Sequence, residues 1–258
     1  MSGFVLAKVE IEETAATIAA DREYIAAAVG AIKAARGQIE RQIRKDRFFL
    51  TTLEPYDSIE SGSQVISRMC DASKAAGVGP MATVAGAIAQ VALEAMASEG
   101  CTHGWVDNGG DIALLLERPE TLEVFSDPRS KTAFALELEP NHEIFGVCSS
   151  SGRLGHSISF GNADVALAIA DDAILADALA TAIGNAVKDL DSLKHCFGRA
   201  AAVPGFRGGI AMLDGNVAVQ GRVPKIIEVE HNPDKLTVHS KMADPRFTGS
   251  CSAMEART

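Results

Sequence analysis

Several features that would place a protein in a specialised class are scarce in this 258-residue sequence. The five cysteines are odd in number, widely spaced and without a Cys-x-x-Cys pair. This pattern argues against a disulfide framework or structural zinc, and favours reduced thiols in a cytoplasmic protein. No apolar run reaches the ~18 residues of a membrane span, and the N-terminus lacks the apolar core of a signal peptide. We therefore expect a cytoplasmic protein with no membrane partner.

Positively charged residues are fewer than negatively charged ones. Lys and Arg total 24 against 34 Asp and Glu, which gives a net charge of −10. Because nucleic-acid affinity comes from clustered cations, we expect no nucleic-acid partner. The one basic cluster, residues 36–47, lies on an expected helix, where such a cluster is more often a solvated face. Hydrophobic residues make up 47% of the chain, enough for a buried core.

Strand and helix patterns follow one another without strict alternation. The patterns predict an α+β fold, a mixed, largely antiparallel sheet packed with several helices. We expect a single domain over residues 1–230 and a polar tail over residues 231–258. Helices are predicted at residues 21–45, 61–76, from 80 onward and from 172 onward. Strands are predicted within residues 3–19 as a hairpin, and at 48–53, 105–107, 111–117, 122–125, 133–138, 145–148, 209–213 and 216–227.

The segment GVGPMATVAGAIAQ has a glycine-flanked helix start. Pro80 suits the first helical position, and free amides beginning near Gly79 would favour a phosphate. A tight loop with close helix packing explains the same glycines equally well. Small residues such as Gly86 leave one helix face bare, so a backbone or a flat ligand can approach it.

The segment WVDNGGDIALLLE joins two strand patterns through Asn108, Gly109, Gly110 and Asp111. Asn-Gly predicts a hairpin turn with positive φ. Such a turn needs no function, yet bare glycine backbone between two acids also suits the edge of a ligand site.

A helix beginning near Asp172 places Asp177 and Thr181 four residues apart on one face. Oxygen donors without nearby thiolate or imidazole suit magnesium better than zinc. The alternative is a solvated edge or a local hydrogen bond, but Asp177 lies among apolar residues, where an unpaired carboxylate is costly.

Between these elements lies a hydroxyl-rich glycine segment that contains Ser150, Ser151, Gly152 and His156. In this setting His156 is either a structural histidine or a phosphate contact and acid or base catalyst. Cys148, at the end of the preceding strand, is either a packing residue or a persulfide carrier.

Taken in order, GVGPMATVAGAIA, NGGDI, SSGRLGHSISFGNAD and ADALATA resemble the ApbE family, and more closely a shorter branch of it. The resemblance covers roughly residues 75 to 190. Many ApbE proteins use magnesium to transfer FMN from FAD onto a protein threonine or serine, and the family was first linked to thiamine biosynthesis. Some members of the shorter branch have been implicated in sulfide assimilation into homocysteine.

The resemblance implies metal ligands at Asp177 and Thr181. It also implies flavin contacts at Asn108, Gly109, Gly110 and Asp111, a Ser-Gly segment at Ser150, Ser151 and Gly152, and a histidine-containing strand near His156. Two departures argue against FMN transfer itself. Residues 85–89 carry no lysine where the transferases have an AKGYA-like motif, and residues 160–164 replace their DPxTG loop.

The sequence thus predicts an ApbE-like protein with a pocket for a flavin nucleotide or another phosphorylated or anionic small ligand, with FAD and magnesium as the implied cofactors. If it is an enzyme, the implied class is a magnesium-dependent transferase with His156 as the catalytic candidate. Two alternatives stay open. One is a non-flavin protein of sulfur assimilation that handles sulfide or persulfide, and the other is a non-catalytic binding protein.

Overall fold

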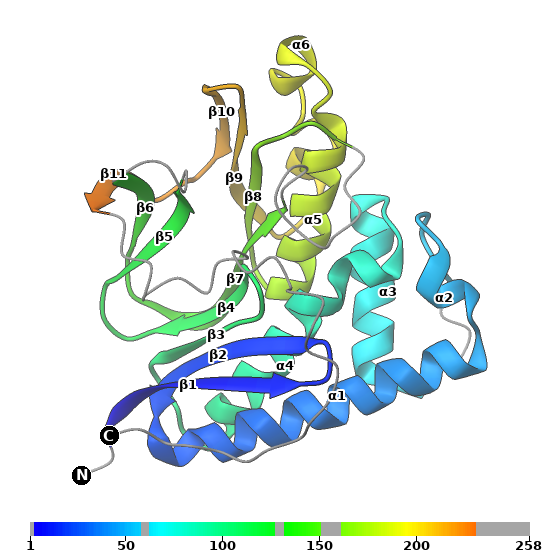
Figure 1. The fold of residues 1–258 in the computed structure, drawn as a ribbon, viewed down its shortest axis with the longest axis vertical. Coiled ribbons are helices and arrows are strands. Elements are labelled where there is room, and N and C mark those ends of the chain that lie inside the picture. The colour runs from blue at the N-terminus through cyan, green and yellow to red at the C-terminus, as the bar shows by residue number, and fades with distance from the viewer. Residues whose placement is uncertain (1–2, 58–61, 127–131, 151–160, 231–258) are drawn as a thin grey trace, which may run out of the picture.

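An eight-stranded antiparallel sheet forms the centre of the fold, seen in a computed structural model (Figure 1). The structure describes all residues except 1–2, 58–61, 127–131, 151–160 and 231–258. The strand order is β1-β2-β3-β4-β7-β8-β9-β10. The strands are β1 Phe4–Ile11, β2 Thr14–Asp21, β3 Gly104–Asp107, β4 Asp111–Leu116, β7 Asn141–Ser150, β8 Val165–Ala170, β9 Phe206–Leu213 and β10 Asn216–Gly221.

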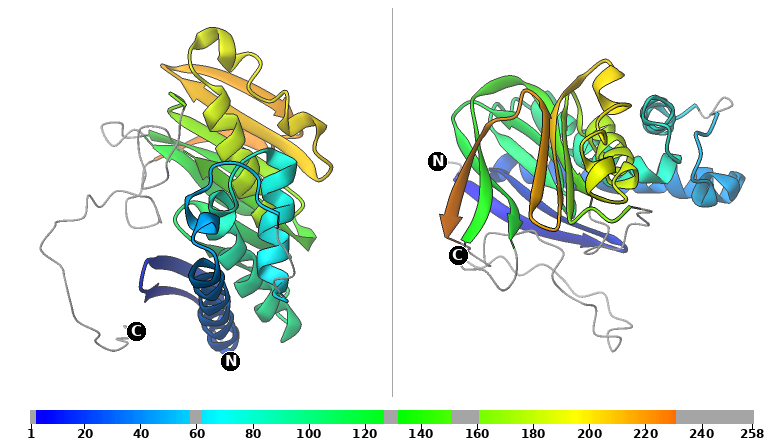
Figure 2. Two further views of the ribbon diagram at one scale, coloured as in Figure 1. Left: turned by 90° about the vertical axis from the view of Figure 1, so that its right-hand side faces the viewer. Right: turned by 90° about the horizontal axis from the view of Figure 1, so that it is seen from above.

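Helices cover one face of this sheet, and a second, three-stranded sheet lies over part of the other face (Figure 2). The second sheet has the order β11-β6-β5, with β5 Glu120–Ser126, β6 Thr132–Leu138 and β11 Lys225–Glu230. The helices are η1 Arg22–Tyr24, α1 Ile25–Lys45, α2 Phe48–Thr51, α3 Gln64–Ala76, η2 Pro80–Thr83, α4 Val84–Ser98, α5 Ala173–Ala186, α6 Leu190–Leu193 and η3 Ala200–Ala202.

Strand β8 shows how the sequence separates the two core layers. Its six residues are all buried, because both faces of the sheet are covered at this strand. Val165, Leu167 and Ile169 face the second sheet. The alternate residues are all alanine and face the helices. These short side chains on the helix side let α5 approach the sheet closely.

The predicted α+β class with a largely antiparallel sheet is confirmed. The opening hairpin is confirmed, with β1 and β2 paired along their whole length. The helix expected from Asp172 is confirmed too, because the Asp172 carboxylate accepts a hydrogen bond from the Leu175 amide at 2.8 Å and so caps α5. The predicted tail, residues 231–258, lies outside the described residues.

Two local predictions were wrong. Residues 48–53 were expected to form a strand, but α2 is a helical turn that begins where Asp46 accepts a hydrogen bond from the Phe48 amide. No described strand pairs with this segment, and β-propensity without a partner strand does not make a strand. The strand expected at 216–227 is divided at Gly221, whose φ of 73° turns the chain from one sheet into the other.

One stretch, Pro80–Ser98, has the length and apolar composition of a membrane span. It lies inside the fold, where α4 packs between α1 and α5. Half of it is buried, and its Gln90 side chain accepts a hydrogen bond from the Ala173 amide at 2.9 Å. These contacts are typical of the core helix of a folded domain.

The close approach of α5 to the sheet predicts a strong effect at Gly146 of β7. A Cβ there would lie 2.4 Å from the Ala173 Cα, a backbone atom that cannot move aside. Gly146→Ala is therefore expected to lower the free energy of unfolding by about 1–3 kcal/mol or more. Urea denaturation measures this change.

Gly30→Ala provides the matched control. Gly30 is exposed on α1 with open space around it, so alanine should stabilise the helix by up to about 1 kcal/mol. Equal effects of the two substitutions would contradict the close packing of α5 on β7.

Candidate functional site

The site is built around one peptide group, the bond between Ala85 and Gly86 in the first turn of α4. The Gly86 N–H donates to the Asp177 Oδ2 atom of α5 at 2.9 Å. The carbonyl of Ala85, the other half of the same peptide, accepts a hydrogen bond from the Asn108 Nδ2 atom at 3.2 Å. Asn108 and Asp177, predicted as ligand residues from separate motifs, therefore meet at one point.

Gly86 makes this geometry possible because it has no side chain. A Cβ at this position would lie 2.2 Å from the Ala173 carbonyl oxygen and 2.8 Å from the Asp177 Cβ. Helix α4 thus contacts α5 backbone to backbone. The bare helix face seen in the sequence accommodates a neighbouring helix.

The turn at residues 107–111 positions Asn108. Its glycines have φ of 73° at Gly109 and 96° at Gly110, the left-handed region that glycine adopts freely. The Asp107 carboxylate accepts the Gly110 amide at 2.8 Å, and the Asp111 carbonyl accepts the Asn108 amide at 3.1 Å. The hairpin predicted from Asn-Gly is present, joining β3 to β4.

The site contains two buried carboxyl groups, those of Asp111 and Asp177, whose pKa values are both raised. Burial raises the pKa of Asp111 well above its usual range, and the charges of Asp177 and Asp107 raise it further. Burial also raises the pKa of Asp177, to about 7, although hydrogen bonds from the Gly86 and Ala85 amides oppose the rise. The site therefore holds carboxyl groups whose ionisation is unfavourable without a compensating cation.

Two buried polar atoms at the site have no hydrogen-bond partner among the described residues: Asp111 Oδ1 and Ser150 Oγ. Both residues are more than nine-tenths buried. Ser150 ends β7 beside α5, and a Cβ on Gly184 would lie 3.6 Å from its hydroxyl oxygen. Unsatisfied buried polar atoms are rare in native proteins and mark a position where a ligand can supply the missing bond.

The donor set suits a hard cation. Thr181 lies one turn beyond Asp177 on α5 and is half-buried. No group of three or more His, Cys, Asp or Glu side chains within the described parts of the chain is arranged to hold a metal. Magnesium does not require such a group, because it is commonly held by one or two carboxylates together with water and a phosphate of the ligand.

Cys148 is not a nucleophile in this structure. Its side chain is fully buried, and its Sγ atom donates to the Ala173 carbonyl at 3.3 Å. Burial, followed by the charges of Asp111 and Asp177, raises the pKa of the thiol well above its ordinary value. The packing interpretation of Cys148 is the one that fits these contacts, since reactivity requires an accessible thiolate.

Of the two interpretations of Gly79, a phosphate contact and close packing, the structure bears on the second. A Cβ there would lie 2.1 Å from the Thr52 carbonyl oxygen, so close backbone packing accounts for this glycine. The segment after it is the short η2, and α4 itself begins only at Val84. The amides at the start of α4 therefore lie at Ala85 and Gly86, where both donate to the Asp177 carboxylate. Three further candidates, Ser151, Gly152 and His156, fall outside the described residues.

Sequence reasoning missed two members of the site, Asp107 and the Ala85–Gly86 peptide. Asp107 is buried and raises the pKa of Asp111. An acid on each side of the Asn-Gly-Gly turn was visible in the sequence and could have indicated it. The peptide carries no such signal, because its role comes from the approach of α5.

The fold is that of ApbE proteins. The structure is similar to the ApbE protein of Thermotoga maritima, with a TM-score of 0.58 and 16% identity over 85% of this chain and 97% of that one. It is also similar to the apo form of the flavinyl transferase ApbE of Pseudomonas stutzeri, with a TM-score of 0.55 and 11% identity over 84% and 94%.

A family model described as "AbpE bacteria" matches residues 4–201, and the chain belongs to this family. Sequence relatives include a UPF0280 protein of Methanocella arvoryzae, 42% identical over 90% of this chain and 94% of that protein. A UPF0280 protein of Archaeoglobus fulgidus is 39% identical over 89% and 97%. The predicted resemblance to a shorter ApbE-like branch is consistent with these relatives.

The raised pKa of Asp177 predicts a specific pH dependence of stability. Because the carboxyl group ionises near pH 4 when unfolded and near 7 when folded, the folded state holds the extra proton between these values. The free energy of unfolding of the metal-free protein should therefore fall as pH rises from about 4 to about 7.

In Asp177→Asn this fall should be much smaller, because an amide does not ionise while its oxygen still accepts the Gly86 N–H. At pH 8 with EDTA, the variant should be more stable than the wild type by about 1–4 kcal/mol, the upper value being the full equivalent of the pKa change. Asp71→Asn, at an exposed acid of α3, is the control. Parallel pH profiles for wild type and Asp177→Asn would show that Asp177 titrates normally.

Proposed function

We propose that the protein binds a flavin nucleotide, or another phosphorylated small anion, together with a divalent cation, at the site formed by Asn108, Asp111, Ser150, Asp177 and Thr181. The observation that carries the proposal is the pairing of unsatisfied buried oxygens, on Asp111 and Ser150, with the amide end of α4. A buried site with open hydrogen-bonding positions beside a helix N-terminus suits a ligand that brings both a cation and phosphate oxygens.

Charge explains why the cation is part of the proposal. None of the described Lys, Arg or His side chains forms an ion pair with Asp111 or Asp177. A phosphate entering this acidic site alone would be repelled. Magnesium held by the Asp177 carboxylate and the Thr181 hydroxyl would neutralise both the acids and the phosphate. In this proposal, α5 holds the two oxygens on one helical face, and the Ala85–Gly86 peptide lies beside them.

The ligand is proposed to bind without efficient FMN transfer. Matched letter by letter, the lysine of the transferases' AKGYA-like motif falls on Gly86. The contact with Ala173 leaves no space for any side chain there. The backbone amide of Gly86 contacts Asp177 instead, and an amide carries only a partial charge. The site therefore lacks the cationic side chain that the resemblance associates with transfer.

Sulfide or persulfide handling has less support, because it needs an accessible thiolate and Cys148 is fully buried. Non-catalytic binding is compatible with the site as described. Binding and transfer are separated by the two experiments that follow.

Calorimetry tests the cation. Magnesium alone should bind weakly to the wild type, since it depends on phosphate oxygens for part of its coordination, and should bind much more tightly when FAD is present. Asp177→Asn should weaken magnesium binding in the presence of FAD by roughly tenfold or more, because even residues that only orient metal ligands are worth about 10–100-fold.

Thr181→Val removes the second oxygen at nearly constant shape and should weaken binding in the same direction. Asp71→Asn should leave it unchanged. Thermal melts give a second readout, because a ligand of the folded state raises the melting temperature. An equal shift in wild type and Asp177→Asn would reduce Asp177 to a buried helix cap.

Incubation with FAD, magnesium and an acceptor protein tests transfer. We expect little covalent FMN on an acceptor threonine, because residues 85–89 carry no lysine and residues 160–164 replace the DPxTG loop. In-gel flavin fluorescence of the acceptor is the measurement, with an ApbE flavinyl transferase as the positive control. Rapid labelling comparable to that control would refute this part of the proposal and leave the binding proposal standing.

A further inference from the structure

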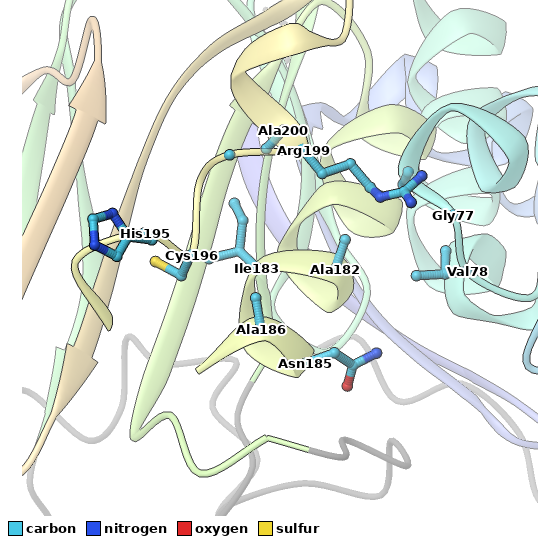
Figure 3. Close-up of a pocket in the computed structure, with 12 residues that line it drawn as sticks. Gly77, Val78, Ala182, Ile183, Asn185, Ala186, His195, Cys196, Arg199 and Ala200 are labelled. Atoms are coloured by element: carbon cyan, nitrogen blue, oxygen red, sulfur yellow. The ribbon is translucent and has the colours of Figure 1, made fainter. Parts of the chain in front are cut away.

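A cavity of about 320 Å³ lies apart from the residues of the site described above (Figure 3). It is open to solvent on one side and is bordered by the end of α3, the last turns of α5 and the segment between α6 and η3. Its lining consists of Ala76, Gly77, Val78, Ala182, Ile183, Asn185, Ala186, His195, Cys196, Gly198, Arg199 and Ala200. Its size falls at the small end of the range for small-molecule sites, about 300–1,000 Å³.

The cavity differs from the Asp177 site in its charge. Among the described residues that line it, none is acidic, although the chain has 34 Asp and Glu and a net charge of −10. The one full charge among the described lining residues is the guanidinium of Arg199. A cavity whose described lining has no acid, in so acidic a protein, favours anions over cations.

The guanidinium of Arg199, an exposed residue, lies against the backbone at the end of α3. Gly77 adopts φ of 71° there, and a Cβ on it would lie 2.4 Å from the Arg199 Nη1 atom. Figure 3 shows the side chain extending across the top of the cavity toward Gly77. Among the described residues, no carboxylate forms an ion pair with this guanidinium. Its fork of donors is therefore available to a carboxylate or phosphate.

The walls select the shape of the ligand. Half of the lining residues are alanine or glycine, so the walls are methyl groups and backbone. On α5, Ala182 and Ala186 form part of the wall, as Figure 3 shows. Walls without long or strongly polar side chains suit an apolar ring better than a strongly polar body.

We propose that this cavity binds a small planar organic anion, a conjugated ring that carries one carboxylate or phosphate, with Arg199 pairing the anionic group. The inference is independent of the proposed flavin-nucleotide site, since it shares no residue with it.

The test is a titration of the full-length protein with benzoate, phenyl phosphate and benzamide, followed by amide chemical shifts in ¹H–¹⁵N NMR spectra. Benzoate and phenyl phosphate should shift the amides of Gly77, Ala186 and Gly198 at millimolar concentrations. Benzamide, an uncharged analogue of benzoate, should bind about tenfold or more weakly, because it cannot form the charge-assisted bonds with Arg199. The stronger of the two anions identifies the preferred group.

Arg199→Gln should reduce the affinity for benzoate by about tenfold or more and bring it close to that for benzamide. Ala186→Leu, at an exposed wall residue, should block all three probes by filling the space. Arg222→Gln, at an exposed arginine outside the cavity, is the matched control and should change nothing.

Three results would overturn the proposal. The first is the absence of shifts at these amides with either anion. The second is equal affinity for benzoate and benzamide. The third is an Arg199→Gln variant that melts at a lower temperature yet binds benzoate like the wild type, which would limit Arg199 to stabilising the end of α3.

Discussion

The Ala85–Gly86 peptide is the constraint on which the rest of the site depends. Its N–H and C=O are both satisfied by side chains, Asp177 and Asn108, that come from other parts of the chain. A buried peptide group at a helix start needs such partners, since its orphan amides have none within the helix. The contact requires glycine at position 86 and small residues beneath α5, and both conditions are met. One peptide thus fixes how α4, α5 and the turn at residues 107–111 lie relative to one another.

This arrangement places acids where burial makes them costly. Burial raises the pKa of both Asp111 and Asp177, and the charge of Asp177 raises that of Asp111 further. Two amides at the start of α4 offset part of this cost, because a helix N-terminus carries roughly half a unit of positive charge. Half a charge does not balance two carboxylates. A sequence under selection for stability alone would replace at least one of them, so their presence favours a role in binding.

The sequence was informative where the signal is local. The helix start near Asp172, the Asn-Gly turn and the opening hairpin each depend on neighbouring residues, and each was predictable. The wrong predictions concern features that depend on tertiary contacts. Residues 48–53 have strand-like composition, but no described strand pairs with them. The division at Gly221 depends on a second sheet, which no local sequence pattern predicts. For the same reason the sequence predicted Asn108 and Asp177 as separate candidates but not the peptide that joins them.

Helix α5 contributes to two surfaces of opposite chemical character. Asp177 and Thr181 present oxygen atoms on one side of the helix. Ala182 and Ala186 lie more than a quarter-turn away around the axis and line a cavity in which Arg199 is the only full charge among the described residues. A net charge of −10 raises the cost of collecting further acids anywhere in the molecule. The protein nevertheless keeps acids at the first surface and excludes them from the second. Because the two surfaces favour charges of opposite sign, a ligand suited to one is unsuited to the other, and α5 separates them physically.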